Sequence, residues 1–251
     1  MRFRLKAFAL HLAASFTALA LVLGTLYLGW YHWPGWYLTH VGPVVGVMAG
    51  VDVVLGPLMT FIIANPGKPR RGLARDIAMI ACVQVIALVY GTTQLWNGRP
   101  LYYAYSVNSM SIVQAYDLEP ASIEAARERK EPLAPHWYSL PRWIWAPLPD
   151  DSAHASRIMA SATTGGFDVT AMPDHYRPWD SGLSDMRAQL KRVDDIKFFS
   201  PAERRALKER MQAAGLPSDQ ANGIALTGRT RPLLAVIDPG SMKILALIEA
   251  T

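Results

Sequence analysis

The stretch "GVDVVLGPLMTFII", residues 50–63, is as apolar as lipid except for a single carboxylate, that of Asp52. A charged side chain at the centre of a bilayer costs about 2.5 kcal/mol or more, so such side chains are rare and usually face other helices or a cavity. Asp52 therefore needs a hydrogen-bonding partner or a proton if this stretch crosses a membrane. Whether it does depends on the sequence around it.

Three apolar runs lie within the first hundred residues, and each reaches the roughly 20 residues that a membrane-spanning helix requires. They cover residues 7–30, 41–63 and 77–96. Only 18% of the 251 residues are charged, whereas average globular chains carry about 25%. The first run is longer than the apolar core of a signal peptide, so we expect it to remain as an uncleaved helix. The sequence predicts a membrane protein with three N-terminal transmembrane α-helices.

Positive charges predict the orientation of these helices. Three Lys or Arg residues precede the first run and four lie in the loop 64–76, whereas residues 31–40 carry none. Because cytoplasmic loops are enriched in Lys and Arg, the N-terminus and the loop 64–76 are predicted to be cytoplasmic. The chain then divides into a transmembrane region, residues 1–97, and a periplasmic domain, residues 98–251, at a bacterial inner membrane.

The net charge of +5 and the isoelectric point of about 9.4 do not indicate a nucleic-acid partner. From residue 97 onward the chain has 18 Lys plus Arg and 18 Asp plus Glu, so the positive surplus lies in the segments that flank the membrane. The sequence has no basic stripe of the kind that follows phosphates. The single cysteine, Cys82, lies in the third apolar run, so the exported domain is predicted to have no disulfide.

The exported part is predicted to be one α+β domain with an antiparallel sheet of about four strands. Aromatic and β-branched residues, capping residues and turn residues mark its elements. The predicted elements are a hairpin of strands 101–107 and 110–116, a helix over 121–130, a helix that begins after Ser200 with a capping box completed by Glu203, and two apolar strands around Pro239 and Gly240. The near-continuous hydrophobicity of this last strand pair indicates strands covered on both faces.

Between these elements lies a proline-rich segment, residues 132–149, that carries four aromatic side chains. Its proline content argues against a regular element. The aromatic residues are Trp137, Tyr138, Trp143 and Trp145. They either cover the core of the domain or form a surface for a partner or for the membrane interface.

Residues suited to catalysis or metal binding do not form a recognisable set. His136, His154 and His175 lack metal-ligand spacing and have no cysteine partners. An intramembrane aspartyl protease would need the carboxyls of Asp52 and Asp76 only about 3 Å apart. The predicted topology separates them by roughly 16 Å in depth, at about 1.5 Å per helical residue. We therefore predict no catalytic residues, no metal and no cofactor.

The second apolar run carries a pattern of small residues. Gly42, Gly46 and Gly50 repeat every four residues on one helix face. Such a seam lets another transmembrane helix approach closely. The seam either packs the three predicted spans together or forms a docking face for a guest helix.

The same run contains a helix-breaking pair, Gly56 and Pro57. Pro57 removes one backbone hydrogen bond and leaves a carbonyl free about one turn earlier, so a kink is expected here. Asp52 and Gln84, of the second and third runs, are both able to form hydrogen bonds across helices. Together with the glycine seam, these four residues are the predicted helix-docking residues.

Three segments carry a family resemblance. They are "GVDVVLGPLMTFII" with the basic loop after it, "RDIAMIACVQVIALVYGTTQLWNGRP" leading into an aromatic strand, and "RPLLAVIDPGSMKILALIEA". These segments resemble the type IV pilin accessory proteins, small inner-membrane proteins. The resemblance covers the three predicted spans well and the exported domain loosely. It implies a non-enzymatic factor that helps its cognate pilin accumulate in the membrane and enter the pilus.

The sequence thus predicts an inner-membrane accessory factor, or chaperone, for pilin stabilisation and pilus assembly. Its expected partner is the cognate pilin, which offers an apolar transmembrane helix and a periplasmic head. The main alternative is a periplasmic ligand-sensing membrane protein, although the sequence shows no cytoplasmic output domain. An envelope enzyme is the second alternative, for which no catalytic set is visible.

Overall fold

The computed structural model describes residues 1–216 and 221–249, and the chain divides into two compact units. Met1–His32 and His40–Gly98 form the first, which we name the helical unit. Trp33–Thr39 and the residues from Arg99 onward form the second, the sheet unit. The end of the predicted periplasmic domain, residues 250–251, lies outside the described residues.

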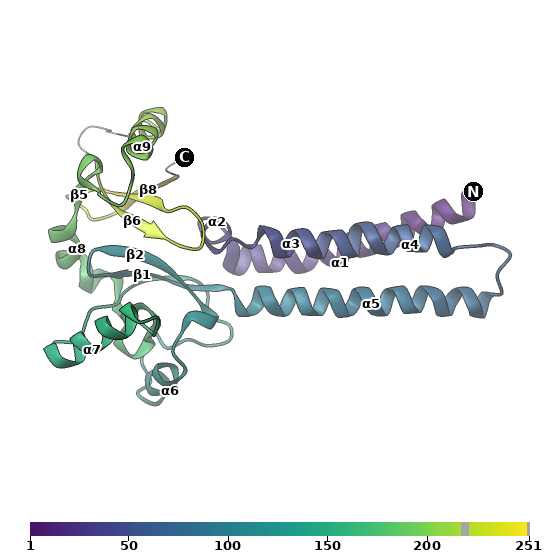
Figure 1. Cartoon of the computed structure of the whole chain (residues 1–251), viewed down its shortest axis with the longest axis horizontal. Coiled ribbons are helices and arrows are strands. Elements are labelled where there is room, and N and C mark those ends of the chain that lie inside the picture. The colour runs from purple at the N-terminus through teal and green to yellow at the C-terminus, as the bar shows by residue number, and fades with distance from the viewer. Residues whose placement is uncertain (217–220, 250–251) are drawn as a thin grey trace. The chain divides into compact units, whose positions relative to one another are not determined.

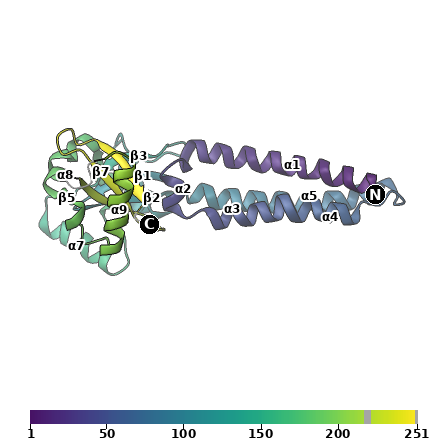
Figure 2. The same ribbon diagram turned by 90° about the horizontal axis from the view of Figure 1, so that it is seen from above.

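Three long helical stretches make up the helical unit, and they lie side by side in Figures 1 and 2. Its elements are α1 (Arg2–Leu26), the π-helical turn η1 (Tyr27–Tyr31), α3 (Gly42–Ala49), the π-helical turn η2 (Gly50–Leu55), α4 (Gly56–Ile63) and α5 (Arg70–Asn97). The stretches of 30, 22 and 28 residues are long and apolar enough to cross a membrane. The prediction of three long apolar helices is confirmed.

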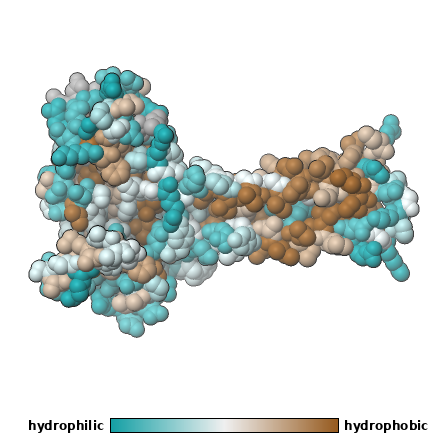
Figure 3. All heavy atoms as spheres, in the orientation of Figure 1, coloured by the Kyte–Doolittle hydropathy of each residue, from teal (hydrophilic) through white to brown (hydrophobic). Residues whose placement is uncertain are grey.

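Most large apolar side chains of the helical unit face outward, which is unusual for a protein surrounded by water. Figure 3 shows hydrophobic residues gathered over the helices, with hydrophilic residues at the N-terminus and at the loop between α4 and α5. The buried interior is a small cluster that includes Leu26, Met48 and Leu95. The Tyr31 hydroxyl donates to the Leu95 carbonyl at 2.7 Å and ties the first stretch to the third.

The sheet unit is built on a sheet of eight strands. They are β1 (Pro100–Ser106), β2 (Ser109–Gln114), β3 (Arg142–Trp145), β4 (Arg177–Pro178), β5 (Lys191–Arg192), β6 (Asn222–Thr227), β7 (Leu233–Ile237) and β8 (Ile244–Glu249). The strand order is β4-β3-β1-β2-β6-β7-β8, and β5 also pairs with β6. Among the helices of this unit are α2 (Gly35–Thr39), α6 (Pro120–Glu128), α7 (Ser152–Thr163), α8 (Leu183–Gln189) and α9 (Pro201–Ala213).

The prediction of an antiparallel sheet is wrong, because the sheet is mixed. β3 pairs with β1 in parallel, and β6 pairs with β2 in parallel. β3 lies inside the proline-rich segment 132–149, which was predicted to be irregular. Residues 142–146 contain no proline, and in them the buried Ile144 and Ala146 alternate with the less buried Trp143 and Trp145, as in a strand. The chain between β1 and β3, which includes β2 and α6, is longer than the dozen residues that a parallel crossover requires.

Several predicted elements are confirmed. β1 and β2 form the antiparallel hairpin, and α6 covers most of the predicted helix 121–130, beginning one residue earlier and ending two residues earlier. α9 begins after Ser200, whose hydroxyl accepts from the Glu203 backbone N–H while the Glu203 carboxylate accepts from the Ser200 backbone N–H. β7 and β8 form the predicted strand pair.

β7 is covered on both faces, as its composition predicts. Leu233, Ala235 and Ile237 point into one buried cluster, whereas Leu234 and Val236 point into another. Successive side chains of a strand point to opposite faces, so this alternation places one cluster on each side of the sheet. For β8 the prediction is wrong, because this strand forms an edge of the sheet and Ile248 is its single buried residue.

The short segment Trp33–Thr39, which links the first two helical stretches, is built into the sheet unit. Leu38 is fully buried in the cluster that contains β1, β2 and β7 residues. Its carbonyl accepts from the Arg229 backbone N–H at 2.7 Å, and the Tyr37 carbonyl accepts from the Thr230 hydroxyl at 2.8 Å. This segment and the chain from Arg99 onward therefore lie on the same side of any membrane that the helices cross.

Candidate functional site in the helical unit

Asp52 lies in η2 and is buried, with 4% of its surface exposed. Its carboxyl atom Oδ2 has no hydrogen-bond partner among the described residues. The side chain lines a cavity of about 420 Å³ between α1 and α5, which we name the Asp52 cavity. A buried polar atom without a partner is costly and is an unusual feature in a native protein.

Three polar side chains form a connected network beside Asp52. His11 Nδ1 lies 2.5 Å from Thr60 Oγ1, and His11 Nε2 lies 2.6 Å from Gln84 Oε1. The amide oxygen of Gln84 only accepts, so Nε2 of His11 carries a proton and donates. In the neutral imidazole, Nδ1 then accepts from the Thr60 hydroxyl. The network joins α1, α4 and α5, and its polar atoms satisfy one another in an apolar setting.

The fourth member of the network is a backbone carbonyl that Pro57 leaves free. The Gly56 N–H donates to the Val51 carbonyl five residues earlier, which is the π-helical pattern. In that pattern the next donor would be residue 57, which would bond the Asp52 carbonyl, but proline has no N–H. Gln84 Nε2 donates to the Asp52 carbonyl at 2.9 Å instead. The predicted break at Pro57 thus takes the form of a π turn closed from α5.

Gly56 makes room for this closure. A Cβ atom at this position would lie 2.0 Å from Gln84 Nε2 and 2.2 Å from Gln84 Cδ. Any larger side chain would therefore displace the amide from the Asp52 carbonyl. Gly56 leaves the space, Pro57 leaves the Asp52 carbonyl without a backbone donor, and Gln84 supplies the donor.

The walls of the Asp52 cavity are mostly small or apolar side chains. Ala7, Ala14 and Ala18 line it from α1, and Ala81 lines it from α5. Small side chains let the backbone of a neighbouring helix approach closely in lipid. The cavity combines a small-residue wall with the unpartnered carboxyl oxygen of Asp52.

The glycine seam lies on a different face of the same helical stretch. A Cβ atom at Gly42, Gly46 or Gly50 would meet nothing within 4 Å. Gly50 and Asp52 lie two positions apart in the sequence, which is roughly half a turn around the helix axis. The structure therefore separates the predicted helix-docking residues into an open glycine face and an inward face that carries Asp52, Gly56, Pro57 and, from α5, Gln84.

The four predicted aromatic residues of the sheet unit also separate into two pairs. Trp137 and Tyr138 are 72% and 57% exposed. Trp143 and Trp145, on β3, are half-buried and pack against the core. The Trp143 ring lies 4.8 Å from the Tyr103 ring, and a Cβ atom on Gly182 would lie 2.5 Å from Trp145 Cγ.

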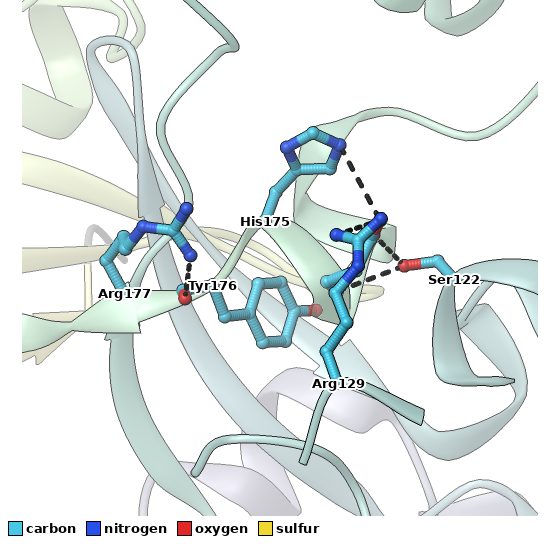
Figure 4. A network of polar contacts seen from close by, with 6 residues as sticks. Ser122, Arg129, His175, Tyr176 and Arg177 are labelled. Atoms are coloured by element: carbon cyan, nitrogen blue, oxygen red, sulfur yellow. Dashed lines mark hydrogen bonds and ion pairs between the residues drawn. The ribbon is translucent and has the colours of Figure 1, made fainter. Parts of the chain in front are cut away.

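A second polar cluster lies in the sheet unit, where Asp174 contacts three side chains that Figure 4 labels: Ser122, Arg129 and His175. The Asp174 carboxylate accepts from the Ser122 hydroxyl, and Arg129 Nη1 and His175 Nε2 lie 3.7 and 4.0 Å from its Oδ2. Burial lowers the pKa of His175, and Asp174 partly opposes this shift. A Ser-His-Asp triad requires the histidine to bond the serine, whereas here the carboxylate does so directly. The cluster fastens α6 to the turn that contains Asp174.

Asp174 and His175 do not belong to a larger group of ligands. Among residues 1–216 and 221–249, no cluster of three or more His, Cys, Asp or Glu side chains is arranged to hold a metal ion.

His11 and Thr60 are not among the residues predicted from the sequence. A signal was present, since His11 lies inside the first apolar run, and an ionisable residue in a membrane segment is a candidate functional residue by default. Thr60 gave no such signal, because a threonine hydroxyl is readily accommodated in a transmembrane helix.

No family model matches the chain, and no solved structure matches it. It is 23% identical to the fimbrial assembly protein of serogroup E1 of Dichelobacter nodosus, over 98% of this chain and 95% of the relative. The serogroup I protein of the same organism gives the same identity and coverage. A third relative, the fimbrial assembly protein of serogroups C1 and C2, is 29% identical over 46% of this chain and 88% of its own length.

These relatives confirm the resemblance that the sequence predicts. Two of the three alignments include both the helical unit and the sheet unit, since they span nearly the whole chain. The chain is similar, along nearly its entire length, to proteins named for fimbrial assembly.

Proposed function

We propose that this protein is a non-enzymatic membrane factor of type IV pilus assembly that holds the transmembrane helix of a pilus subunit before assembly. The names of its relatives support a role in pilus assembly and suggest contact with pilus components. The three long apolar helices are compatible with a membrane protein. We also propose that the protein acts as a chaperone that stabilises the subunit.

The proposed orientation places the sheet unit in the periplasm of a bacterial inner membrane. The excess of Lys and Arg at the N-terminus and in the loop 64–76 supports it. The packing of Trp33–Thr39 within the sheet unit supports a common side for the first loop and the tail. The periplasmic head of the subunit is then within reach of the sheet unit.

The observation that carries the proposal is the unpartnered, buried Oδ2 atom of Asp52 at the Asp52 cavity. A carboxyl oxygen in an apolar setting is stabilised by a hydrogen-bond donor or a cation. A guest helix against the small residues of α1 would bring such a group to Asp52. The glycine seam remains the second candidate docking face, since it is open but carries no polar group.

Substitution of Asp52 tests this proposal. Asp52→Ala should reduce recovery of the pilus subunit with this protein roughly three- to twentyfold, since one interhelical hydrogen bond in lipid contributes about 0.6 to 1.7 kcal/mol. Surface pili should fall with it, while the protein stays in the membrane at its usual level. Asp52→Asn keeps an acceptor without the charge, and so separates hydrogen bonding from ion pairing.

Val54→Ala is the matched control, because Val54 lies on the same turn but is 57% exposed. It should leave pilus assembly unchanged. Normal pilus numbers in both Asp52 variants, at native protein levels, would remove Asp52 from the working site.

A further inference from the structure

The loop that carries Trp137 and Tyr138 is held in place by side chains from the rest of the sheet unit. Arg99 Nη2 donates to the Trp137 carbonyl at 3.3 Å, and Arg127 Nη2 donates to the Pro135 carbonyl at 2.9 Å. The Tyr102 hydroxyl donates to the Leu133 carbonyl at 2.6 Å. These bonds fix the loop backbone, so its outward side chains are presented in a defined arrangement.

This ordered loop exposes a cluster of large apolar side chains. Trp137, Tyr138 and Leu140 are 72%, 57% and 54% exposed. The Tyr138 ring stacks on His136 at 5.4 Å, and the Trp137 ring meets it edge-on at 5.5 Å. The core of the sheet unit does not use these side chains. A contiguous exposed apolar patch on a fixed loop indicates a surface that contacts something other than water.

The position of Arg99 indicates what that surface contacts. α5 ends at Asn97, and Arg99 follows two residues later. If α5 crosses the membrane, Arg99 lies where the chain leaves the bilayer. Its guanidinium bonds the Trp137 backbone, so the loop lies within one side-chain length of that point. An aromatic loop bonded to the residue that follows a span would be close enough to contact lipid headgroups.

We propose that the segment His136–Leu140 is a membrane-interface anchor, with Trp137 and Tyr138 inserted among the lipid headgroups of the leaflet at which α5 ends. Tryptophan and tyrosine are the residues enriched at membrane interfaces, because their rings are apolar and their N–H and O–H groups remain hydrated. The anchor holds the sheet unit against the bilayer. It depends on α5 being a span and not on the proposed role in pilus assembly.

A second aromatic pair in the sheet unit supports the same placement. Trp33 and Trp36 are 46% and 38% exposed, in the segment between two helical stretches that are apolar enough to span. The chain therefore carries exposed tryptophans near its points of entry into the sheet unit, as an interfacial belt requires.

Spin labels measure this contact in the intact protein. We would replace Cys82 with serine, introduce a single cysteine by Trp137→Cys or Tyr138→Cys, and reconstitute the labelled protein in phosphatidylethanolamine and phosphatidylglycerol vesicles. Phe198→Cys is the matched control, since Phe198 is also exposed, at 57%, in the sheet unit. It lines a cavity with Asn108, at the far end of β1 from Arg99, roughly 20 Å away.

In vesicles, labels at 137 and 138 should collide several-fold less with an aqueous nickel chelate, and more with oxygen, than the label at 198. Equal accessibility at 137, 138 and 198 would overturn the proposal. Protection that occurs only when a pilus subunit is reconstituted with the protein would also overturn it, because it would assign the loop to a protein contact. Circular dichroism and native membrane levels would establish that each cysteine variant is folded.

Discussion

Gly46 and Gly56 lie ten residues apart on the same helical stretch, and an added methyl group would have opposite consequences at the two positions. At Gly46 it would meet nothing within 4 Å, whereas at Gly56 it would lie 2.0 Å from Gln84 Nε2. The stretch therefore has an outward face without internal contacts and an inward face fixed by polar bonds to two other helices. The difference teaches that a glycine in a membrane helix can serve the fold on one face and remain available to a partner on another.

The largest expected effect is that of Gly56→Ala on the stability of the helical unit. The methyl group would displace Gln84 and break its bonds to the Asp52 carbonyl and to His11. Two interhelical hydrogen bonds in lipid are worth about 1 to 3 kcal/mol together. Unfolding in mixed micelles, titrated with a denaturing detergent, would measure the loss. Gly46→Ala is the control and should change the stability little. Equal losses of stability in the two variants would show that the two glycines do not differ in their role in the fold.

A double-mutant cycle sharpens the assignment of that loss to Gln84. If Gly56→Ala acts by displacing the amide, the same substitution should cost little in a Gln84→Ala background. The coupling between the two positions should then be close to the whole effect of Gly56→Ala. Additive losses would mean that Gly56 serves the backbone of η2 and α4 rather than the amide.

Thr60→Val tests the far end of the polar network and should have a smaller effect. Valine keeps the shape of threonine but cannot donate to His11 Nδ1, which lies 2.5 Å from the hydroxyl. We expect a loss of about 1 kcal/mol in the same detergent titration. Thr93→Val is a suitable comparison, because the Thr93 hydroxyl bonds only the Val89 carbonyl of its own helix and is exposed. Equal losses of stability in Thr60→Val and Thr93→Val would show that the Thr60–His11 bond does not stabilise the packing of the helices.

The smallest expected effect is that of Gly46→Leu on the fold itself. The position is exposed, so leucine should leave the unfolding transition of the free protein unchanged. A lower membrane level of Gly46→Leu in cells that contain no pilus subunit would show that the outward face packs within the protein or within an oligomer.

The sequence was sufficient to predict the three apolar helices, the β1–β2 hairpin and the capping box at Ser200, because each depends on residues close together in the chain. It did not predict the parallel neighbours of β1 and β2, because these depend on long crossovers. β3 was not predicted for a local reason: prolines on either side of residues 142–146 indicate irregular structure, although the short stretch between them forms a strand.

The candidate site was predictable only in part. Asp52, Pro57 and Gln84 stand out in an apolar sequence, and the free carbonyl that Pro57 leaves was expected. The hydrogen bonds of Gln84 to this carbonyl and to His11 were not predictable, because they depend on how three separate helices are rotated. Glycine spacing alone likewise could not tell the open face of Gly46 from the filled face of Gly56.

The central claim is that a guest helix docks at the Asp52 cavity, and photo-crosslinking in living cells tests it most directly. A photoreactive amino acid at Ala14, which is exposed on the cavity wall, would be compared with one at Gly46 on the glycine seam. We predict adducts with the pilus subunit from position 14 that diminish when Asp52 is replaced by alanine. Adducts from position 46 alone would move docking to the glycine seam, and adducts from neither position would contradict docking within the helical unit.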